Sequence, residues 1–175
     1  MLTLAIAGCA ASHSRQTDQP TAGPSLAAVA PAGWCHSVSP AASFCRALAI
    51  AAPRATLQLA VAETDARRER GLMGVTRLDA GQGMIFVFPD VADRRRDFWM
   101  KDTLLPLDMV FVRTDGSVSS VSADVPATKP GTPDSGIARR AGLGRYVIEL
   151  RAGGAHAAGL EPGTRLFIPP IDAPD

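Results

Sequence analysis

Two carboxylates within apolar segments are the first candidates for chemistry in this chain of 175 residues. The stretch DFWMKDTLLPLDMVFV, residues 97–112, carries Asp108 inside an apolar run, with Trp99 and Lys101 just upstream. A buried carboxylate must be paired or hydrogen-bonded, because burying it alone is costly. The sequence therefore predicts either a structural clamp at Asp108, held by Lys101, Arg145 or turn amides, or the wall of a binding site.

The second interpretation joins residues of separate strands into one pocket. A tryptophan beside carboxylates and a lysine suits stacking on a sugar ring while hydrogen-bonding its hydroxyls. Binding requires less of these residues than catalysis, so we expect a binding module for an envelope glycan or another small polar ligand. The predicted ligand-binding residues are Trp99, Lys101, Asp102, Thr103, Asp108, Arg145 and Glu149.

Two alternatives remain open. In a glycan-acting hydrolase, Asp108 and Glu149 would divide the acid and base roles, if their separation were suitable. In a copper-binding envelope protein, thioethers would act as soft ligands for Cu(I). Methionine also fills gaps in cores, and none here stands in a Met-x-Met or His-Met arrangement. Apart from Met1, the methionines are Met73, Met84, Met100 and Met109.

The N-terminus resembles the end of a bacterial lipoprotein signal. Residues 6–9, Ile-Ala-Gly-Cys, match a lipobox, in which the cysteine is lipidated and becomes the new N-terminus. No basic residue precedes the apolar run and eight residues are too few for a signal, so we expect a start codon upstream of Met1. The segment is too short for a transmembrane helix. Ala10 after Cys9 favours the outer membrane, so the sequence predicts a lipid-anchored protein on the periplasmic side of the envelope.

Residues 10–53 are dominated by Ala, Ser, Pro, Gly and Thr, which predicts a tether between the lipid and a domain at 54–170. Cys35 and Cys45 are the cysteines that remain, and in an oxidising compartment the pair would form a disulfide. Zinc is the competing interpretation, but His36 alone leaves a four-ligand site incomplete. A short helix is possible between residues 34 and 50.

The composition excludes several functions. The net charge is +1 and 20% of the residues are charged. The chain lacks the basic stripe that is typical of a nucleic-acid binder. The cluster at residues 94–96 reads as a solvated turn. There is no phosphate loop, dinucleotide fingerprint or Gly-x-Ser-x-Gly motif. His13, His36 and His156 share no metal spacing. We therefore expect no cofactor and no nucleic-acid partner.

The elements that would position these residues are mostly strands. Alternating apolar residues predict a strand at 55–63, and Thr64 predicts the N-cap of a helix ending near Gly74. Further strands are expected at 83–88, 96–101, 107–113, 117–125, 145–150 and within 160–168, with a hairpin turn at 114–116. Apolar and polar residues alternate imperfectly in the expected strand at 117–125, which indicates a bulge. A small-residue helical turn is expected at 152–159.

Residues 126–144 read as a long polar loop, which would be functional or mobile. With so few helices, a doubly wound parallel sheet is excluded. The predicted fold class is α+β, mainly β: a small curled, largely antiparallel sheet or barrel with two short covering helices.

The blocks ERGLMGVTRLDAGQGMIFVFPD, FWMKDTLLPLDMVFVRTDGSV and RYVIELRAGGAHAAGLEPGTRL, in this order, resemble the family called domain of unknown function 192. The resemblance covers about residues 55–168. It implies a small β-rich domain, often exported or lipid-anchored, with no agreed activity. Two departures are that Asp102 stands where members carry Asn, and that residues 125–135 lack a cysteine found before a proline in relatives.

Overall fold

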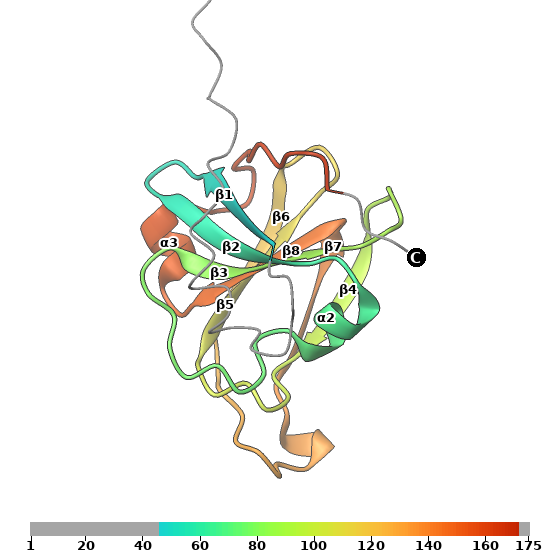
Figure 1. Ribbon diagram of the computed structural model, residues 1–175, viewed down its shortest axis with the longest axis vertical. Coiled ribbons are helices and arrows are strands. Elements are labelled where there is room, and N and C mark those ends of the chain that lie inside the picture. Colours follow the sequence, from blue (N-terminus) through green and yellow to red (C-terminus); the bar gives the residue numbers. More distant parts are fainter. Residues whose placement is uncertain (1–45, 172–175) are drawn as a thin grey trace, which may run out of the picture.

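The computed structural model describes residues 46–171, and its centre is an open six-stranded sheet in the order β1-β2-β3-β8-β5-β6 (Figure 1). Neighbouring strands are antiparallel except for β2 and β3, which are parallel. The strands are β1 (Ala47–Ala51), β2 (Thr56–Ala62), β3 (Gln82–Val87), β5 (Leu107–Val112), β6 (Val118–Val125) and β8 (Tyr146–Arg151).

Both faces of this sheet are buried. Side chains alternate along each strand, so residues two apart project to the same side. On β5, Leu107, Met109 and Phe111 belong to one apolar cluster, called here the first face, whereas Val110 and Val112 belong to the cluster on the second face. This alternation on β5 was predicted from the sequence. The central strands are consequently apolar on both sides, and any carboxylate they carry is buried.

The two short helices lie on opposite sides of the sheet, as Figure 1 shows. Helix α2 (Asp65–Arg70) begins as predicted at Thr64, whose side chain accepts a hydrogen bond from the Arg67 amide. It ends earlier than expected, at Gly71, whose positive φ of 48° favours glycine. Helix α3 (Gly154–Ala158) occupies the predicted helical turn and packs Ala155 and Ala158 on the second face.

A two-stranded ribbon covers the first face. It pairs β4 (Arg94–Trp99) with β7 (Arg139–Gly144), so the expectations of a turn at 94–96 and of an unstructured loop through residue 144 were wrong. Gly142 lies directly over the Phe111 ring, where a Cβ atom would come within 2.2 Å of it. The ribbon therefore approaches the sheet where β7 has no side chain, a contact that local sequence patterns do not reveal.

The loop from 126 to 138 contains a short 3-10 helix, η1 (Asp134–Gly136), and protrudes at one end of the molecule (Figure 1). The hairpin between β5 and β6 turns at residues 114–116 as predicted, with Gly116 donating to the Arg113 carbonyl. Register shifts between these strands confirm the expected bulge.

The sheet is mainly antiparallel and accompanied by two short helices, which confirms the α+β, mainly β class. It remains open, because β1 and β6 form its edges, so the barrel form of the prediction was wrong. Strand β1 lies inside the segment assigned to a tether, where its pairing with β2 organises residues without a clear sequence pattern. Residues 160–168 form no strand and contribute an isolated bridge between Ser117 and Arg165.

The lipobox, Cys9, most of the tether and the Cys35–Cys45 pair lie outside the described residues. Within residues 46–171, no helix combines the length and apolar character needed to cross a bilayer.

Asp108 is a structural clamp. It projects onto the second face, is 1% exposed, and accepts hydrogen bonds from the backbone amides of Asp124 and Ala155, each at 2.9 Å. These bonds fix the irregular end of β6 and the first turn of α3 to β5. A clamp held by backbone amides was one of the predicted forms, and it is confirmed. The predicted ion pairs with Lys101 and Arg145 were wrong, because both carboxylate oxygens accept bonds from main-chain amides.

We expect Asp108→Asn to lower the free energy of unfolding by about 2–4 kcal/mol, because the amide group presents a donor to one of two buried N–H groups. Urea unfolding monitored by circular dichroism measures this loss. The matched control is Asp97→Asn, which removes an exposed carboxylate paired with Arg95 and should cost less than about 0.5 kcal/mol. Equal midpoints for both variants would contradict the clamp.

Candidate functional site

The candidate site is centred on Glu149, in the middle of β8. Its direct cross-strand neighbours are Met84 on β3 and Met109 on β5, so the carboxyl group stands on the first face among apolar side chains. The residue is 4% exposed. Alternation along β8 produces this position, since Val147 precedes Glu149 on the same face and Ile148 and Leu150 point to the other.

Within residues 46–171, Glu149 has no hydrogen bond and no ion pair to its carboxylate, unlike the equally buried Asp108. Burial without compensation disfavours the charged form, and it raises the pKa of Glu149 to about 8. The side chain is therefore mostly protonated at neutral pH. Such an unpaired acid in an apolar sheet face is costly to the fold.

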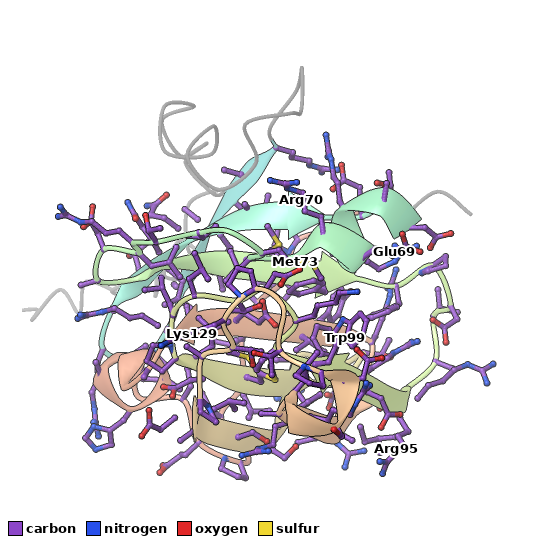
Figure 2. The ribbon with its side chains drawn as sticks, turned by 90° about the horizontal axis from the view of Figure 1, so that it is seen from below. Glu69, Arg70, Met73, Arg95, Trp99 and Lys129 are labelled. Carbon is purple, nitrogen blue, oxygen red and sulfur yellow. The ribbon has the colours of Figure 1, made fainter. Side chains whose placement is uncertain are left out.

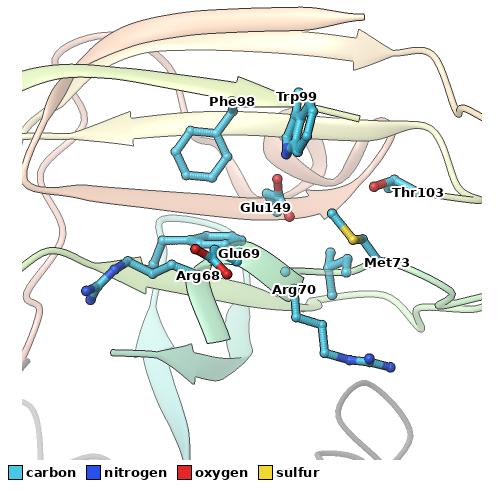
Figure 3. A pocket seen from close by; sticks show the side chains of 11 residues that line it. Arg68, Glu69, Arg70, Met73, Phe98, Trp99, Thr103 and Glu149 are labelled. Carbon is cyan, nitrogen blue, oxygen red and sulfur yellow. The ribbon is translucent and has the colours of Figure 1, made fainter. Parts of the chain in front are cut away.

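Glu149 faces a small pocket between the α2 segment and β4 (Figure 3). Its solvent space is about 30 Å³, enough for one water or ion rather than a sugar ring. Three aromatic side chains, those of Phe86, Phe98 and Trp99, contribute to its walls. Phe98 packs edge-on against Phe86, with ring centroids 4.8 Å apart, which anchors β4 over the sheet. The other lining residues are Arg68, Glu69, Arg70, Gly71, Leu72, Met73 and Thr103.

The two sides of the pocket are tied together by the main chain. The amide of Gly74 donates to the carbonyl of Asp102 at 2.9 Å, which joins the segment after α2 to the turn after β4. Asp102 has a φ of 47°, a left-handed conformation that Asn and Asp adopt more readily than other non-glycine residues.

Thr103 closes one side of the pocket. It is buried, and its hydroxyl donates to the Lys101 carbonyl at 3.0 Å, so its lone pairs remain to accept a bond from a ligand. Its own carbonyl accepts from the Thr128 amide, which attaches the long loop to this turn. Figure 3 shows the Thr103 hydroxyl on the side of the pocket that holds Glu149.

The charged residues at the rim do not neutralise Glu149. Arg68 donates to the Asp65 side chain and to the carbonyls of Glu63 and Val87. In Figure 3 the guanidinium groups of Arg68 and Arg70 point away from Glu149. Figure 2 shows Glu69, Arg70 and Met73 on the α2 side of this surface and Trp99 on the β4 side.

Trp99 is flanked by cations. Lys101 Nζ lies 5.0 Å and the Arg139 guanidinium carbon 5.1 Å from the ring, within cation–π range. Two cations beside the indole leave less of the ring free for stacking on a sugar.

The predicted site residues therefore divide. Trp99, Thr103 and Glu149 line one pocket, and Lys101 and Asp102 lie in the adjoining turn. Asp108 was wrongly included, since it lies on the opposite face of the sheet. Arg145 was also wrong, because its guanidinium lies over the Tyr146 ring and it does not line the pocket. The hydrolase pair fails for the same reason: Asp108 is opposite Leu150 in the register, so its carboxylate and that of Glu149 project to different faces.

A second hollow, of about 190 Å³, lies beside α3 on the second face. It is lined by Asp108, whose oxygens are already bonded, and by the exposed residues Arg54, His156 and Glu161. Since no buried polar group is left unsatisfied there, this hollow is a weaker candidate than the Glu149 pocket.

Sequence reasoning missed the aromatic and α2 side of the site. Phe98 directly precedes Trp99 in the sequence, so it could have been included among the predicted site residues. The positions of Glu69 and Arg70 at the pocket have no local signal, because they depend on how α2 packs, and Met73 was named only as a candidate copper ligand. In residues 46–171, no three His, Cys, Asp or Glu side chains are grouped to hold a metal.

The fold and this sequence define the class of the protein. The family model of domain of unknown function 192, described as "Uncharacterized ACR, COG1430", matches residues 48–168, well over half of the chain. The chain belongs to this family, as the sequence resemblance indicated. No curated protein matches it.

Two solved structures are similar to this one. A proposed transcription regulator from Sinorhizobium meliloti 1021 is 32% identical, with 68% of this chain and 89% of that chain covered and a TM-score of 0.54. A protein of unknown function from Novosphingobium aromaticivorans DSM 12444 is 25% identical, with 76% and 96% covered and a TM-score of 0.57.

The raised pKa of Glu149 predicts how stability depends on pH. The folded protein holds a proton that the unfolded chain loses near pH 4.5, so this contribution is fully present below about pH 4.5 and is lost as the pH rises to about 8. Relative to Glu149→Gln, which does not titrate, the wild type should lose several kcal/mol of unfolding free energy across this interval. Urea unfolding at a series of pH values measures the difference, and parallel pH profiles for the two proteins would contradict it.

Proposed function

We propose that the domain is a binding module that takes the polar group of a small ligand into the Glu149 pocket. The observation that carries this proposal is the buried carboxyl of Glu149, which faces the pocket without a partner among residues 46–171. A purely structural residue at the centre of a sheet would be expected to be apolar or satisfied, as Asp108 is. An acid that is costly to the fold is expected where a ligand makes use of it.

The dimensions of the pocket favour a small ligand group over a whole glycan ring. A space of about 30 Å³ admits a single polar group or ion. The cations beside Trp99 oppose the stacking role expected for a glycan binder. Of the two predicted ligand classes, the small polar ligand is therefore the better supported.

The similar protein from Sinorhizobium meliloti is a proposed regulator of transcription, but the arginines of this chain do not favour DNA binding. On the ribbon, Arg94 and Arg96 pair with Asp90, and Arg95 pairs with Asp97. These pairings place two carboxylates among the three arginines, which reduces the positive charge that would otherwise suit a phosphate backbone.

We also propose that the chain is a lipid-anchored envelope protein, on the basis of the lipobox-like residues 6–9. In this arrangement the domain would present the Glu149 pocket on the periplasmic side of the membrane, at the end of a tether.

The binding proposal is tested by thermal unfolding in the presence of a panel of small ligands. The panel comprises cell-wall sugars, amino acids, small amines and metal ions. A ligand at a hundred times its Kd should raise the Tm by about 5–10 °C. We expect at least one compound to stabilise the wild type and Asp97→Asn but not Glu149→Gln. If every stabilising compound acts equally on Glu149→Gln, the pocket is not the binding site.

The anchor is tested by metabolic labelling with a palmitate analogue in bacteria that express the gene with its native upstream region. We expect label in the membrane fraction for the wild type and none for Cys9→Ser, because the thiol carries the lipid. A Cys35→Ser variant is the matched control and should remain labelled. Equal labelling of Cys9→Ser would contradict the proposal.

A further inference from the structure

We propose that the Glu149 pocket binds the primary carboxamide group of a small ligand, with the Glu149 carboxyl and the Thr103 hydroxyl as its hydrogen-bonding partners. This inference rests on the proposed binding function and names the ligand class of the same pocket. A primary carboxamide is a terminal –CONH2 group, as in acetamide or in the side chains of asparagine and glutamine. It is uncharged, and it combines an acceptor oxygen with two N–H donors.

Two buried polar side chains of the pocket, those of Glu149 and Thr103, offer one donor and two acceptors. A protonated carboxyl group, as Glu149 carries at neutral pH, has one O–H donor and a carbonyl oxygen that accepts. Thr103 donates its own hydroxyl hydrogen to the Lys101 carbonyl at 3.0 Å, so toward the pocket it acts as an acceptor. Figure 3 shows this hydroxyl on the side of the pocket that holds Glu149. This pattern is complementary to that of a carboxamide.

A carboxyl group and a carboxamide can pair through two hydrogen bonds. The O–H group of Glu149 would donate to the amide oxygen, and one amide N–H would donate to the carbonyl oxygen of Glu149. The second N–H would donate to the hydroxyl oxygen of Thr103, so each polar group of the amide has a partner. An alcohol has a single hydrogen to donate, and it would leave one acceptor of the pocket without a partner.

Cationic ligands do not suit the pocket. The charged groups around Glu149 come from three elements, namely Arg68, Glu69 and Arg70 of α2, Lys101 and Asp102 of the turn after β4, and Arg139 of β7. On β3 and β5 its cross-strand neighbours are uncharged methionines. Lys101 and Arg139 lie 5.0 Å and 5.1 Å from the Trp99 ring, so a cation in the pocket would lie near two like charges. Among the described residues that line the pocket, Met73 supplies the one thioether, which is too few for a soft metal ion.

Anionic ligands do not suit the pocket either. A carboxylate has acceptors alone, and it would direct one of them at the lone pairs of Thr103. The guanidinium groups of the lining are not directed at the pocket interior, because Arg68 is bonded to Asp65 and Arg70 points away from Glu149 in Figure 3. An uncharged ligand group avoids placing an uncompensated charge between the aromatic walls.

The size and walls of the pocket agree with a flat, uncharged group. A solvent space of about 30 Å³ admits one small polar group and excludes a sugar ring. Phe98 and Trp99 contribute apolar surface against which a planar amide can pack. Glu69 and Arg70 line the pocket and are exposed, so the rest of a ligand can extend past them into solvent.

The test compares probes of the same planar shape: acetamide, acetate and acetamidinium. Acetate offers acceptors alone and is negative, acetamidinium offers donors alone and is positive, and acetamide offers both without charge. Each probe is titrated into the full chain at about pH 6.5, and the shift of the Trp99 indole N–H resonance gives the Kd. We expect acetamide to bind at least about tenfold more tightly than either ion.

Variants of the two polar side chains connect this binding to the pocket. Glu149→Met places an apolar side chain on an apolar face and removes both a donor and an acceptor, so acetamide affinity should fall about a hundredfold. Thr103→Val removes one acceptor and keeps the side-chain shape, so we expect a loss of about tenfold. Thr128→Val is the matched control, because Thr128 is buried but does not line the pocket, and its affinity should stay within about twofold of the wild type.

The pH dependence tests whether the proton of Glu149 takes part. The affinity of the wild type for acetamide should be constant below about pH 7. It should fall at least about tenfold by about pH 9.5, because Glu149, with a pKa of about 8, then loses the donor. Glu149→Gln does not titrate and offers an N–H in place of the O–H. Its affinity should be at least about tenfold lower than that of the wild type at about pH 6.5 and should not change with pH.

Each outcome decides the inference. Acetamide binding that is no tighter than acetate binding, that is unchanged in Glu149→Met, or that does not depend on pH in the wild type overturns it. If acetate or acetamidinium requires Glu149 and acetamide does not, the carboxamide class is wrong and the proposed binding function stands. If no probe and no compound of the thermal panel depends on Glu149, both are wrong.

Discussion

The burial of both faces of the six-stranded sheet governs the rest of this structure. The ribbon of β4 and β7 and the α2 segment cover one face, and α3 covers the other. Every polar group on the central strands must therefore be satisfied internally, neutralised or reserved for a ligand. The two acids on these strands, Asp108 and Glu149, meet this constraint in different ways, and their difference distinguishes the clamp from the candidate site.

Asp108 illustrates full satisfaction. Each of its oxygens accepts a bond from a main-chain amide, and the donors belong to β6 and to α3. A single side chain thus connects β5, β6 and α3 on the second face. The strand register directs Asp108 to the second face, so it cannot contact a ligand bound on the first face.

Glu149 illustrates the opposite case. Its burial raises its pKa to about 8, so at neutral pH the fold keeps it mostly protonated. The Gly74–Asp102 bond and the aromatic packing of Phe98 hold the walls in place around it. A small pocket with one buried acid suits the polar group of a small ligand.

The order of the three sequence blocks was enough to predict the family. The β-rich class and most strand positions were also predictable, because period-two alternation and turn residues act over a few neighbouring positions. It also determined which residues share a face of β5 and where α2 begins. It did not reveal β1 or β7, whose pairing supplies the organisation that their own composition lacks.

Which of the candidate residues come together depends on the tertiary structure. The strand register put Met84, Glu149 and Met109 side by side and sent Asp108 to the other face. The packing of α2 brought Met73 into the pocket, and the left-handed turn at Asp102 carried Thr103 to it. These contacts join positions far apart in the chain, and local patterns contain no information on which strands become neighbours.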